Sequence, residues 1–210
     1  MKYWYKFSQN FIIKPGSWLL FHIFRKVKIS GREEFKRVAG PVLIVSNHIA
    51  FYDSFLIGLS LPLFSPLVPL RYMGEYIKFN HRFLDFLRKI GLIPLLFRIM
   101  GVFPSKRGEG IDAAIKTPLD ILRSGETVVM FPEGRVQKSG ALGVFRHGAS
   151  AIALGAKVPV IPIAIKAQGR NIQICVGEPF RLDDSNSITV EEGTAVIHEK
   201  ILALFENIRA

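Results

Sequence analysis

Three short, continuously apolar stretches rich in β-branched residues constrain the fold of this chain more than any other feature. They are Pro-Val-Leu-Ile-Val at 41–45, Thr-Val-Val-Met-Phe at 127–131 and Val-Pro-Val-Ile-Pro-Ile-Ala-Ile at 158–165. A strand that is apolar at nearly every position is typical of a sheet covered on both faces, as parallel sheets are. A fourth stretch, 171–176, alternates apolar and polar residues, which predicts a strand with one wetter face.

Helical patterns lie between and after these stretches, around 83–90, 111–123 and 146–155 and from 189 toward 208. Thr189 followed by Glu192 predicts a capping box at the start of the last helix. Strands that alternate with helices predict an α/β fold, here a single domain with a mainly parallel central sheet flanked by helices. In such sheets ligands bind beyond the carboxyl ends of the strands, which points to the residues after 45 and after 131.

The first half of the chain combines an excess of positive charge with long apolar stretches. Of the 210 residues 49% are hydrophobic. The formal net charge of +11 comes from +7 in residues 1–40 and +6 in residues 71–107, while residues 41–70 and 151–210 each carry −1. This hydrophobicity excludes a disordered chain. A nucleic-acid-binding module would more often place its basic residues among polar neighbours, and none is recognisable. Basic residues interleaved with aromatic and aliphatic ones indicate an anionic membrane surface, so we expect a lipid bilayer and no nucleic acid as partner.

None of the apolar stretches is long enough to cross a bilayer as an uninterrupted helix. Lys-Pro-Gly at 14–16 breaks the stretch 7–24, three prolines break 54–70, and Arg98 interrupts 90–104. Each therefore falls short of the ~20 clean apolar residues that a transmembrane helix needs.

We therefore predict that residues 1–30 form an amphipathic, helical segment that anchors the chain at the membrane interface, and that residues 31–210 form the α/β domain. Within the first segment we expect Lys6, Lys14 and Arg25 to contact anionic lipid. An ordinary core helix is the alternative interpretation of this segment.

The first predicted strand is followed by Ser-Asn-His-Ile-Ala-Phe-Tyr-Asp-Ser at 46–54. His48 and Asp53 suit a general base and the carboxylate that orients it. In one regular helix, residues five apart point about 140° away from each other. The two side chains can therefore meet only if a turn follows His48 and Asp53 lies near the start of the next helix. A purely structural pair is the alternative.

The second predicted strand is followed by Glu133, Gly134 and Arg135. The glycine would let backbone approach a ligand, the carboxylate could accept hydrogen bonds from a polyol, and the arginine could pair with phosphate. A plain turn between strand and loop is the alternative.

A third cluster begins at Gly101 and ends with Lys106 and Arg107. Two adjacent cations between glycines suit either an anion pocket or a solvated turn. The five histidines are scattered and no zinc spacing occurs, so no metal site is predicted.

In their order and spacing, these clusters together resemble the PlsC-type glycerolipid acyltransferase family, whose best-known members are 1-acyl-sn-glycerol-3-phosphate acyltransferases. The resemblance extends from about Val27 to Phe180. It is carried by Asn-His-x-x-x-x-Asp from 47, Gly-x-Phe-x-x-x-Arg from 101, Phe-Pro-Glu-Gly from 131, the strand at 158–165, Phe-Arg-His-Gly-Ala at 145–149 and Val-Gly-Glu-Pro-Phe at 176–180.

The resemblance implies transfer of a fatty acyl group from an acyl thioester, carried by acyl carrier protein or CoA, to the free hydroxyl of a lysophospholipid. The most direct case converts lysophosphatidic acid to phosphatidic acid. His48 would deprotonate the acceptor hydroxyl, and Asp53 would hold the imidazole. Arg107 would bind the acceptor's phosphate, while Glu133 and Gly134 would shape the acceptor pocket. The thioester is a co-substrate, and no cofactor is expected.

The same motifs make Asn47, Gly101, Lys106 and Arg135 substrate-binding candidates. Two of them depart from the family pattern, which commonly has an acidic or amide residue at the position of Lys106 and often Gly-Thr-Arg where Gly134 is followed directly by Arg135. Another lysophospholipid or an aminoacyl lysolipid is therefore an alternative acceptor, and a catalytically silent lipid-binding relative is an alternative function. We expect a membrane-associated protein, monotopic or peripheral, on the cytoplasmic face.

Overall fold

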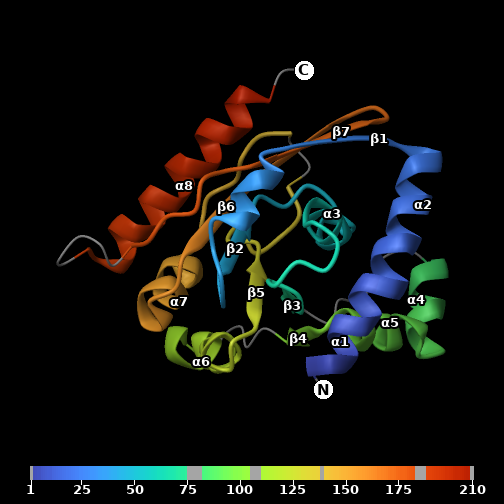
Figure 1. Ribbon diagram of the computed structural model, residues 1–210, viewed down its shortest axis with the longest axis horizontal. Coiled ribbons are helices and arrows are strands. Elements are labelled where there is room, and N and C mark those ends of the chain that lie inside the picture. The colour runs from blue at the N-terminus through green and yellow to red at the C-terminus, as the bar shows by residue number, and fades with distance from the viewer. Residues whose placement is uncertain (1, 75–81, 105–109, 138–139, 183–187, 209–210) are drawn as a thin grey trace.

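One central sheet of seven strands organises the part of the chain that the computed structural model describes, which is residues 2–74, 82–104, 110–137, 140–182 and 188–208. Its order is β1-β7-β6-β2-β5-β3-β4 (Figure 1). Every adjacent pair is parallel except β6 and β7, which are antiparallel neighbours. The predicted mainly parallel α/β fold is thus confirmed. The strands are β1 (Lys26–Ser30), β2 (Leu43–Ser46), β3 (Leu70–Gly74), β4 (Val102–Pro104), β5 (Thr127–Met130), β6 (Val160–Gln168) and β7 (Asn171–Val176).

Helices cover both faces of this sheet. Figure 1 shows α6, α7 and α8 on one side of the molecule and α1, α2, α4 and α5 on the other. The capping box predicted at Thr189 is confirmed, since its side chain accepts from the backbone N–H of Glu192, whose carboxylate accepts from the N–H of Thr189. The helices are α1 (Lys2–Ser8), α2 (Lys14–Phe24), α3 (Asp53–Ser60), α4 (Arg82–Lys89), α5 (Leu92–Met100), α6 (Ile111–Arg123), α7 (Gly148–Ala156) and α8 (Val190–Asn207).

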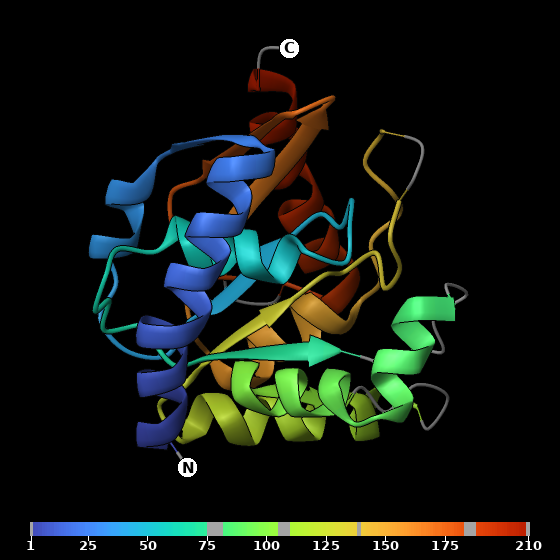
Figure 2. The same cartoon turned by 90° about the vertical axis from the view of Figure 1, so that its right-hand side faces the viewer.

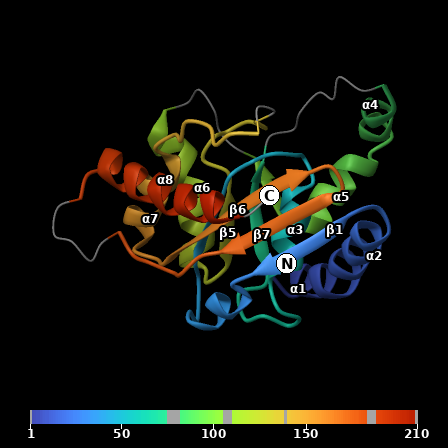
Figure 3. The ribbon, with the colours of Figure 1, turned by 90° about the horizontal axis from the view of Figure 1, so that it is seen from above.

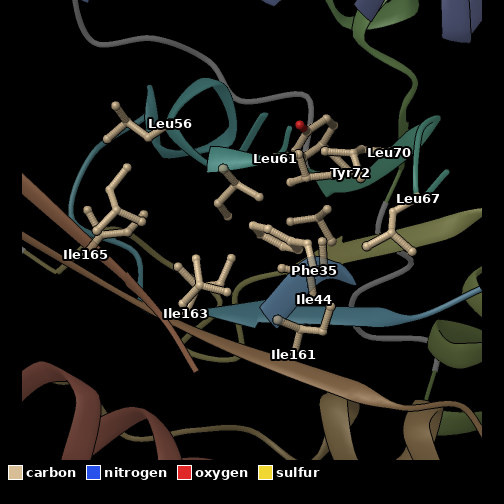
Figure 4. Packing of buried hydrophobic residues seen from close by; sticks show 14 of the residues in the cluster. Phe35, Ile44, Leu56, Leu61, Leu67, Leu70, Tyr72, Ile161, Ile163 and Ile165 are labelled. Carbon is tan, nitrogen blue, oxygen red and sulfur yellow. The ribbon is translucent and has the colours of Figure 1, made fainter. Parts of the chain in front are cut away.

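The central strands β2 and β5 are buried at every position and largely apolar, because each face of the sheet packs into its own hydrophobic cluster. In β2, Ile44 belongs to one cluster, whereas Leu43 and Val45 belong to the other. The cluster on the side of α3 includes Ile161, Ile163 and Ile165 of β6 and residues of α3, β3 and the connecting segments (Figure 4). Full burial of one such aliphatic side chain stabilises the fold by about 1.5–3 kcal/mol.

The N-terminal segment is helical from Lys2 to Phe24, so the break predicted at 14–16 is wrong. A π-helical turn (Gln9–Ile13) joins α1 to α2, and the N–H of Lys14 donates to the carbonyl of Gln9, five residues earlier. This wider turn relieves the clash that the ring of Pro15 would cause in a regular helix. The helical direction is therefore kept through Lys-Pro-Gly.

The side chain of Gln9 fixes this segment to the sheet. Its Nε2 donates to the carbonyls of Leu70 (2.6 Å) and Met100 (2.8 Å), and its Oε1 accepts from the N–H of Leu70 (2.8 Å). The side chain is buried, and all three bonds lie at the start of β3 and the end of α5. The N-terminal segment is thus part of the folded body.

Two details correct expectations for residues 1–30. β1 pairs with β7 along its whole length, so the sheet begins at Lys26 and not after residue 30. Lys14 is buried, and its Nζ donates to the carbonyl of Pro62 at 2.7 Å, so this lysine does not face lipid. Burial, reinforced by the charge of Arg32, lowers the pKa of Lys14 to about 8.

The outer surface of the N-terminal helices is strongly apolar. Figure 2 looks at the side of the molecule on which α1, α2, α4 and α5 lie. Among the described residues, no helix has both the length and the apolar character needed to span a membrane. The large apolar side chains of α1, the π-helical turn and α2 that are 47–87% exposed are Tyr3, Trp4, Phe7, Phe11, Ile12, Trp18, Leu19, Leu20, Ile23 and Phe24.

Candidate active site

His48 and Asp53 form a hydrogen-bonded pair immediately beyond the carboxyl end of β2. His48 Nδ1 lies 2.8 Å from Asp53 Oδ2. Asp53 is fully buried, whereas the His48 side chain is 18% exposed. Because Nδ1 is engaged by the carboxylate, Nε2 is the ring nitrogen that can exchange a proton with a ligand.

The turn between the two residues is built around the same carboxylate. Asp53 Oδ2 also accepts hydrogen bonds from the backbone N–H groups of Ile49 (2.7 Å) and Ala50 (2.8 Å). Asp53 is the first residue of α3, where the helix dipole favours a negative charge. The two side chains could meet only if a turn follows His48 and Asp53 lies near the start of a helix, and the structure contains both features.

Phe131 and the loop that follows β5 hold the histidine from the other side. The rings of His48 and Phe131 stack with centroids 4.2 Å apart and planes 15° apart. The N–H of Gln137 donates to the carbonyl of His48 at 2.7 Å. The carboxyl ends of the neighbouring strands β2 and β5 therefore meet at this site, as the topology predicts.

Glu133 lies beside the histidine as a buried carboxyl group. Only 4% of the residue is exposed, and neither carboxylate oxygen makes a well-formed hydrogen bond with a described residue. Burial raises the pKa of Glu133, and the nearby backbone N–H groups of Gly143 and His48 offset only part of this effect. Such a group is ready to hydrogen-bond a polar ligand or to hold a proton.

Gly134 creates space for an arginine that the sequence did not place in the site. Its φ is 68°, and a Cβ there would lie 3.2 Å from Nε of Arg146. The N–H of Arg146 donates to the carbonyl of Pro132 at 2.9 Å, which brings the start of α7 against the loop after β5. Arg135 and Arg146 are both exposed, so two cations lie at this turn.

Two of the predicted substrate-binding residues have structural positions instead. The amide of Asn47 is buried, donating to the carbonyl of Ile165 (2.8 Å) and accepting from its N–H (2.7 Å). It joins the ends of β2 and β6, with both polar atoms of the amide bonded to the backbone of Ile165. Gly101 ends α5 in the left-handed conformation, with φ at 78°, and its carbonyl accepts from Arg71 Nε at 3.0 Å. Lys106 and Arg107 lie outside the described residues.

The sequence interpretation missed Phe131 and Arg146 as parts of the site, although both stand inside motifs that it used. Phe131 begins Phe-Pro-Glu-Gly, and its position as the last residue before the turn could have indicated a contact with the neighbouring strand end. The exposed cation after Phe145, at a helix start facing the loop after β5, could have indicated Arg146.

The described residues define an α/β protein with a histidine at the carboxyl ends of its central strands. A buried carboxylate orients this histidine, and a buried glutamate and a cationic turn lie next to it. A family model described as Acyltransferase matches residues 26–166. A chloroplastic 1-acyl-sn-glycerol-3-phosphate acyltransferase of Brassica napus is 33% identical over 164 residues, which are 77% of this chain and 43% of that protein. The 1-acyl-sn-glycerol-3-phosphate acyltransferase of Bacillus subtilis is 26% identical over 185 residues, with 83% and 84% covered.

The crystal structure of the 1-acyl-sn-glycerophosphate acyltransferase PlsC from Thermotoga maritima has a TM-score of 0.71 to this fold, at 21% identity, over 94% of this chain and 79% of that one. The chain belongs to the PlsC-type acyltransferase family. It spans less than half the length of the two plant relatives that it matches.

Proposed function

We propose that this chain transfers a fatty acyl group from an acyl thioester to the free hydroxyl of a lysophospholipid, most directly 1-acyl-glycerol 3-phosphate. The observation that carries the proposal is the His48–Asp53 pair, with Nδ1 and Oδ2 at 2.8 Å, in a chain of this family. The names of the relatives from Brassica napus and Bacillus subtilis support this choice of acceptor.

In the proposed reaction, Nε2 of His48 removes the proton of the acceptor hydroxyl as its oxygen attacks the thioester carbonyl. Asp53 stabilises the resulting imidazolium. The tetrahedral intermediate collapses, the C–S bond breaks, and the thiolate takes the proton back from His48. A new C–O ester bond has replaced the thioester, and no covalent enzyme intermediate, metal or nucleotide is needed. A positioned base of this kind contributes about 10²–10⁴-fold to the rate.

We assign recognition of the acceptor to the turn after β5. Arg146 packs on Gly134 close to Glu133, so a phosphate held by its guanidinium would leave the glycerol part of the acceptor near the buried carboxyl group. Lys106 and Arg107 stay candidates for the same phosphate. Glu133, with its raised pKa, would hydrogen-bond the glycerol hydroxyl or ester oxygen.

The lysophospholipid acceptor would reach the site from a bilayer. We propose that the exposed apolar surface of α1 and α2 binds one leaflet without crossing it. Gln9 fixes this helical segment to the sheet, and the apolar side chains on the outer side of the helices are exposed to solvent. The proposal covers both carriers of the donated acyl group, acyl carrier protein and CoA.

A reconstituted assay tests the function. Purified protein is added to vesicles that contain lysophosphatidate, lysophosphatidylglycerol or lysophosphatidylcholine, with acyl-CoA or acyl carrier protein as donor, and the acylated product is quantified. We expect phosphatidate to form fastest, and His48→Ala to reduce turnover by at least about 10²-fold. Absence of product from every acceptor and donor, or equal activity of His48→Ala, would refute the proposal.

A further inference from the structure

A basic groove lies at the opposite edge of the sheet from β4, where β1, β7 and β6 meet the end of α2. Figure 3 looks down on these three strands, with α2 beside them and the end of α8 across from it. The groove has a volume of about 590 Å³. The residues that line it are His22, Arg25, Lys26, Val27, Lys28, Lys166, Gln168, Asn171, Ile172 and Gln173. Its described lining therefore holds four permanent cations, one histidine and no acidic residue.

Strand register aligns the polar side chains of this groove in two rows. Lys28 is paired with Gln173, which is paired in turn with Lys166 on the third strand. Lys26 is paired with Asn171 in the adjacent row, which continues to Gln168 on β6. Paired residues of neighbouring strands project to the same face. Lysines and amides thus lie side by side across the face, and all of them can donate hydrogen bonds to an anion.

Hydrogen bonds between α2 and the turn after β6 hold the groove in shape. Arg25 Nη1 donates to the carbonyl of Gly169 at 2.8 Å, and Arg170 donates to the carbonyls of Ile23 (3.1 Å) and Phe24 (3.3 Å). Arg170 thereby satisfies two carbonyls at the end of α2, where the last carbonyls of a helix have no partner within it. The cations of β1 are therefore presented by a braced edge strand and not by a loose terminus.

Lys26 and Lys28 are the groove cations best placed to meet a ligand. Both are exposed positions of β1. Lys166 is partly engaged, because its Nζ donates to the carbonyl of Ile208 at 3.2 Å and lies over the ring of Phe205. Arg25 already contacts Gly169.

The rim of the groove indicates where its ligand comes from. The last turn of α2 presents Ile23 and Phe24, 56% and 61% exposed, next to His22, which lines the groove. Apolar side chains of this size that remain in contact with water favour insertion among lipid chains. Basic residues at the end of such a helix then lie at the depth of the lipid headgroups.

We propose that this groove binds the phosphate of an anionic phospholipid headgroup in the leaflet on which α1 and α2 lie. The lysines of β1 and the amides of β7 surround the phosphate, while the acyl chains of the same lipid pack beside Ile23 and Phe24. The site is separate from His48 and would make membrane binding depend on lipid charge. It rests on the proposed membrane association and not on the proposed acyl transfer.

Vesicle flotation with a matched pair of variants tests the site. Lys26→Gln/Lys28→Gln removes two charges from the groove, and Lys116→Gln/Arg123→Gln removes two from exposed positions of α6, on the other side of the molecule. Each basic residue at an anionic surface contributes about 1 kcal/mol, so the groove variant should bind vesicles with phosphatidylglycerol roughly 30-fold more weakly. The α6 variant should change this binding less than about threefold.

Neutral vesicles and a charge-preserving variant complete the design. Both double variants should bind phosphatidylcholine vesicles as the unmodified chain does, since the apolar surface of α2 is unchanged. Lys26→Arg/Lys28→Arg should retain binding to phosphatidylglycerol vesicles. The weaker binding of Lys26→Gln/Lys28→Gln would then result from the lost charges and not from a folding defect. Equal losses in the groove and α6 variants would overturn the proposal, because only net charge would then matter.

Two further outcomes would assign the groove to another ligand. Displacement from phosphatidylglycerol vesicles by millimolar inorganic phosphate, at constant ionic strength, would show a site for a free anion. In detergent micelles without anionic lipid, Lys26→Gln/Lys28→Gln should retain the KM for either acyl donor. A raised KM would mean that the groove serves the donor, and either result would overturn the headgroup site while leaving the acyl transfer intact.

Discussion

Replacing Asp53 by asparagine separates the electrostatic role of this residue from its structural role. Oδ2 of Asp53 accepts three hydrogen bonds, from His48 and from the N–H groups of Ile49 and Ala50. An asparagine oxygen in the same place can still accept them, so the turn and the orientation of the imidazole are retained. What is lost is the negative charge beside the imidazolium that forms during the reaction.

The size of that loss follows from the short distance. Nδ1 and Oδ2 are 2.8 Å apart, which places the charge centres about 4 Å apart, and two unit charges at this separation interact by about 4 kcal/mol at an effective dielectric constant of about 20. Because the imidazolium exists only after proton transfer, the loss appears in the barrier. We expect Asp53→Asn to lower kcat roughly 10³-fold with little change in KM.

Asp53→Ala provides the structural comparison. It leaves the N–H groups of Ile49 and Ala50 without their acceptor in a buried turn, which should cost about 2 kcal/mol or more of unfolding free energy. Asp53→Asn should cost less than about half as much. Steady-state release of the donor thiol gives kcat and KM, and urea unfolding followed by circular dichroism gives stability. If Asp53→Asn keeps kcat within about threefold of the unmodified chain, the reasoning about the imidazolium is refuted.

Three other changes probe the residues around the site and the N-terminal segment. Since burial lowers the pKa of Lys14 to about 8 from the 10.5 of a free lysine, the folded chain releases a proton that the unfolded chain keeps, and the free energy of unfolding should rise between about pH 8 and 10.5. In urea titrations at pH 7.5, 9 and 10, Lys14→Met should abolish this rise, and its persistence would contradict a buried lysine. Gly134→Ala should destabilise by about 1 kcal/mol through its φ of 68° and displace Arg146, which raises the KM for the lysophospholipid more than it lowers kcat; an unchanged KM would exclude Arg146 as a phosphate ligand. Gln9→Leu removes three buried hydrogen bonds and should increase proteolysis within the first 24 residues before global unfolding, whereas unchanged cleavage would mean that apolar packing alone holds the segment.

The predicted strands and the His48–Asp53 contact came from signals that lie close together in the sequence. β2 and β5 are apolar on both faces, so their composition alone distinguishes them from edge strands. The contact of His48 with Asp53 needed only one turn and one helix start, both within six residues. Local patterns of this kind do not depend on the rest of the fold.

The features that sequence reasoning missed depend on distant partners. β1 reads as Lys-Val-Lys-Ile-Ser, an alternation that also suits the end of an amphipathic segment, and only its pairing with β7, about 145 residues later, makes it a strand. Lys14 reads as a membrane-facing cation, and only the carbonyl of Pro62 shows that it is buried. Asn47 reads as a polar group at a site, whereas its amide is occupied by Ile165.

Strand β6 connects the proposed catalytic site to the proposed lipid groove through two adjacent residues. The backbone of Ile165 binds the amide of Asn47, next to His48, and its side chain lies in the core on the side of α3. Lys166 follows it and, because neighbouring residues of a strand point to opposite faces, lies in the groove. The antiparallel β7 and the edge strand β1 extend this end of the sheet beyond the parallel core, and the two exposed lysines of β1 can meet a headgroup there. A phosphate bound there would hold the end of β6 at the headgroup layer, the same depth at which the phosphate of a lysophospholipid in that leaflet lies. The proposed arrangement therefore aligns acceptor and catalytic base through the sheet itself, without requiring the N-terminal helices to move.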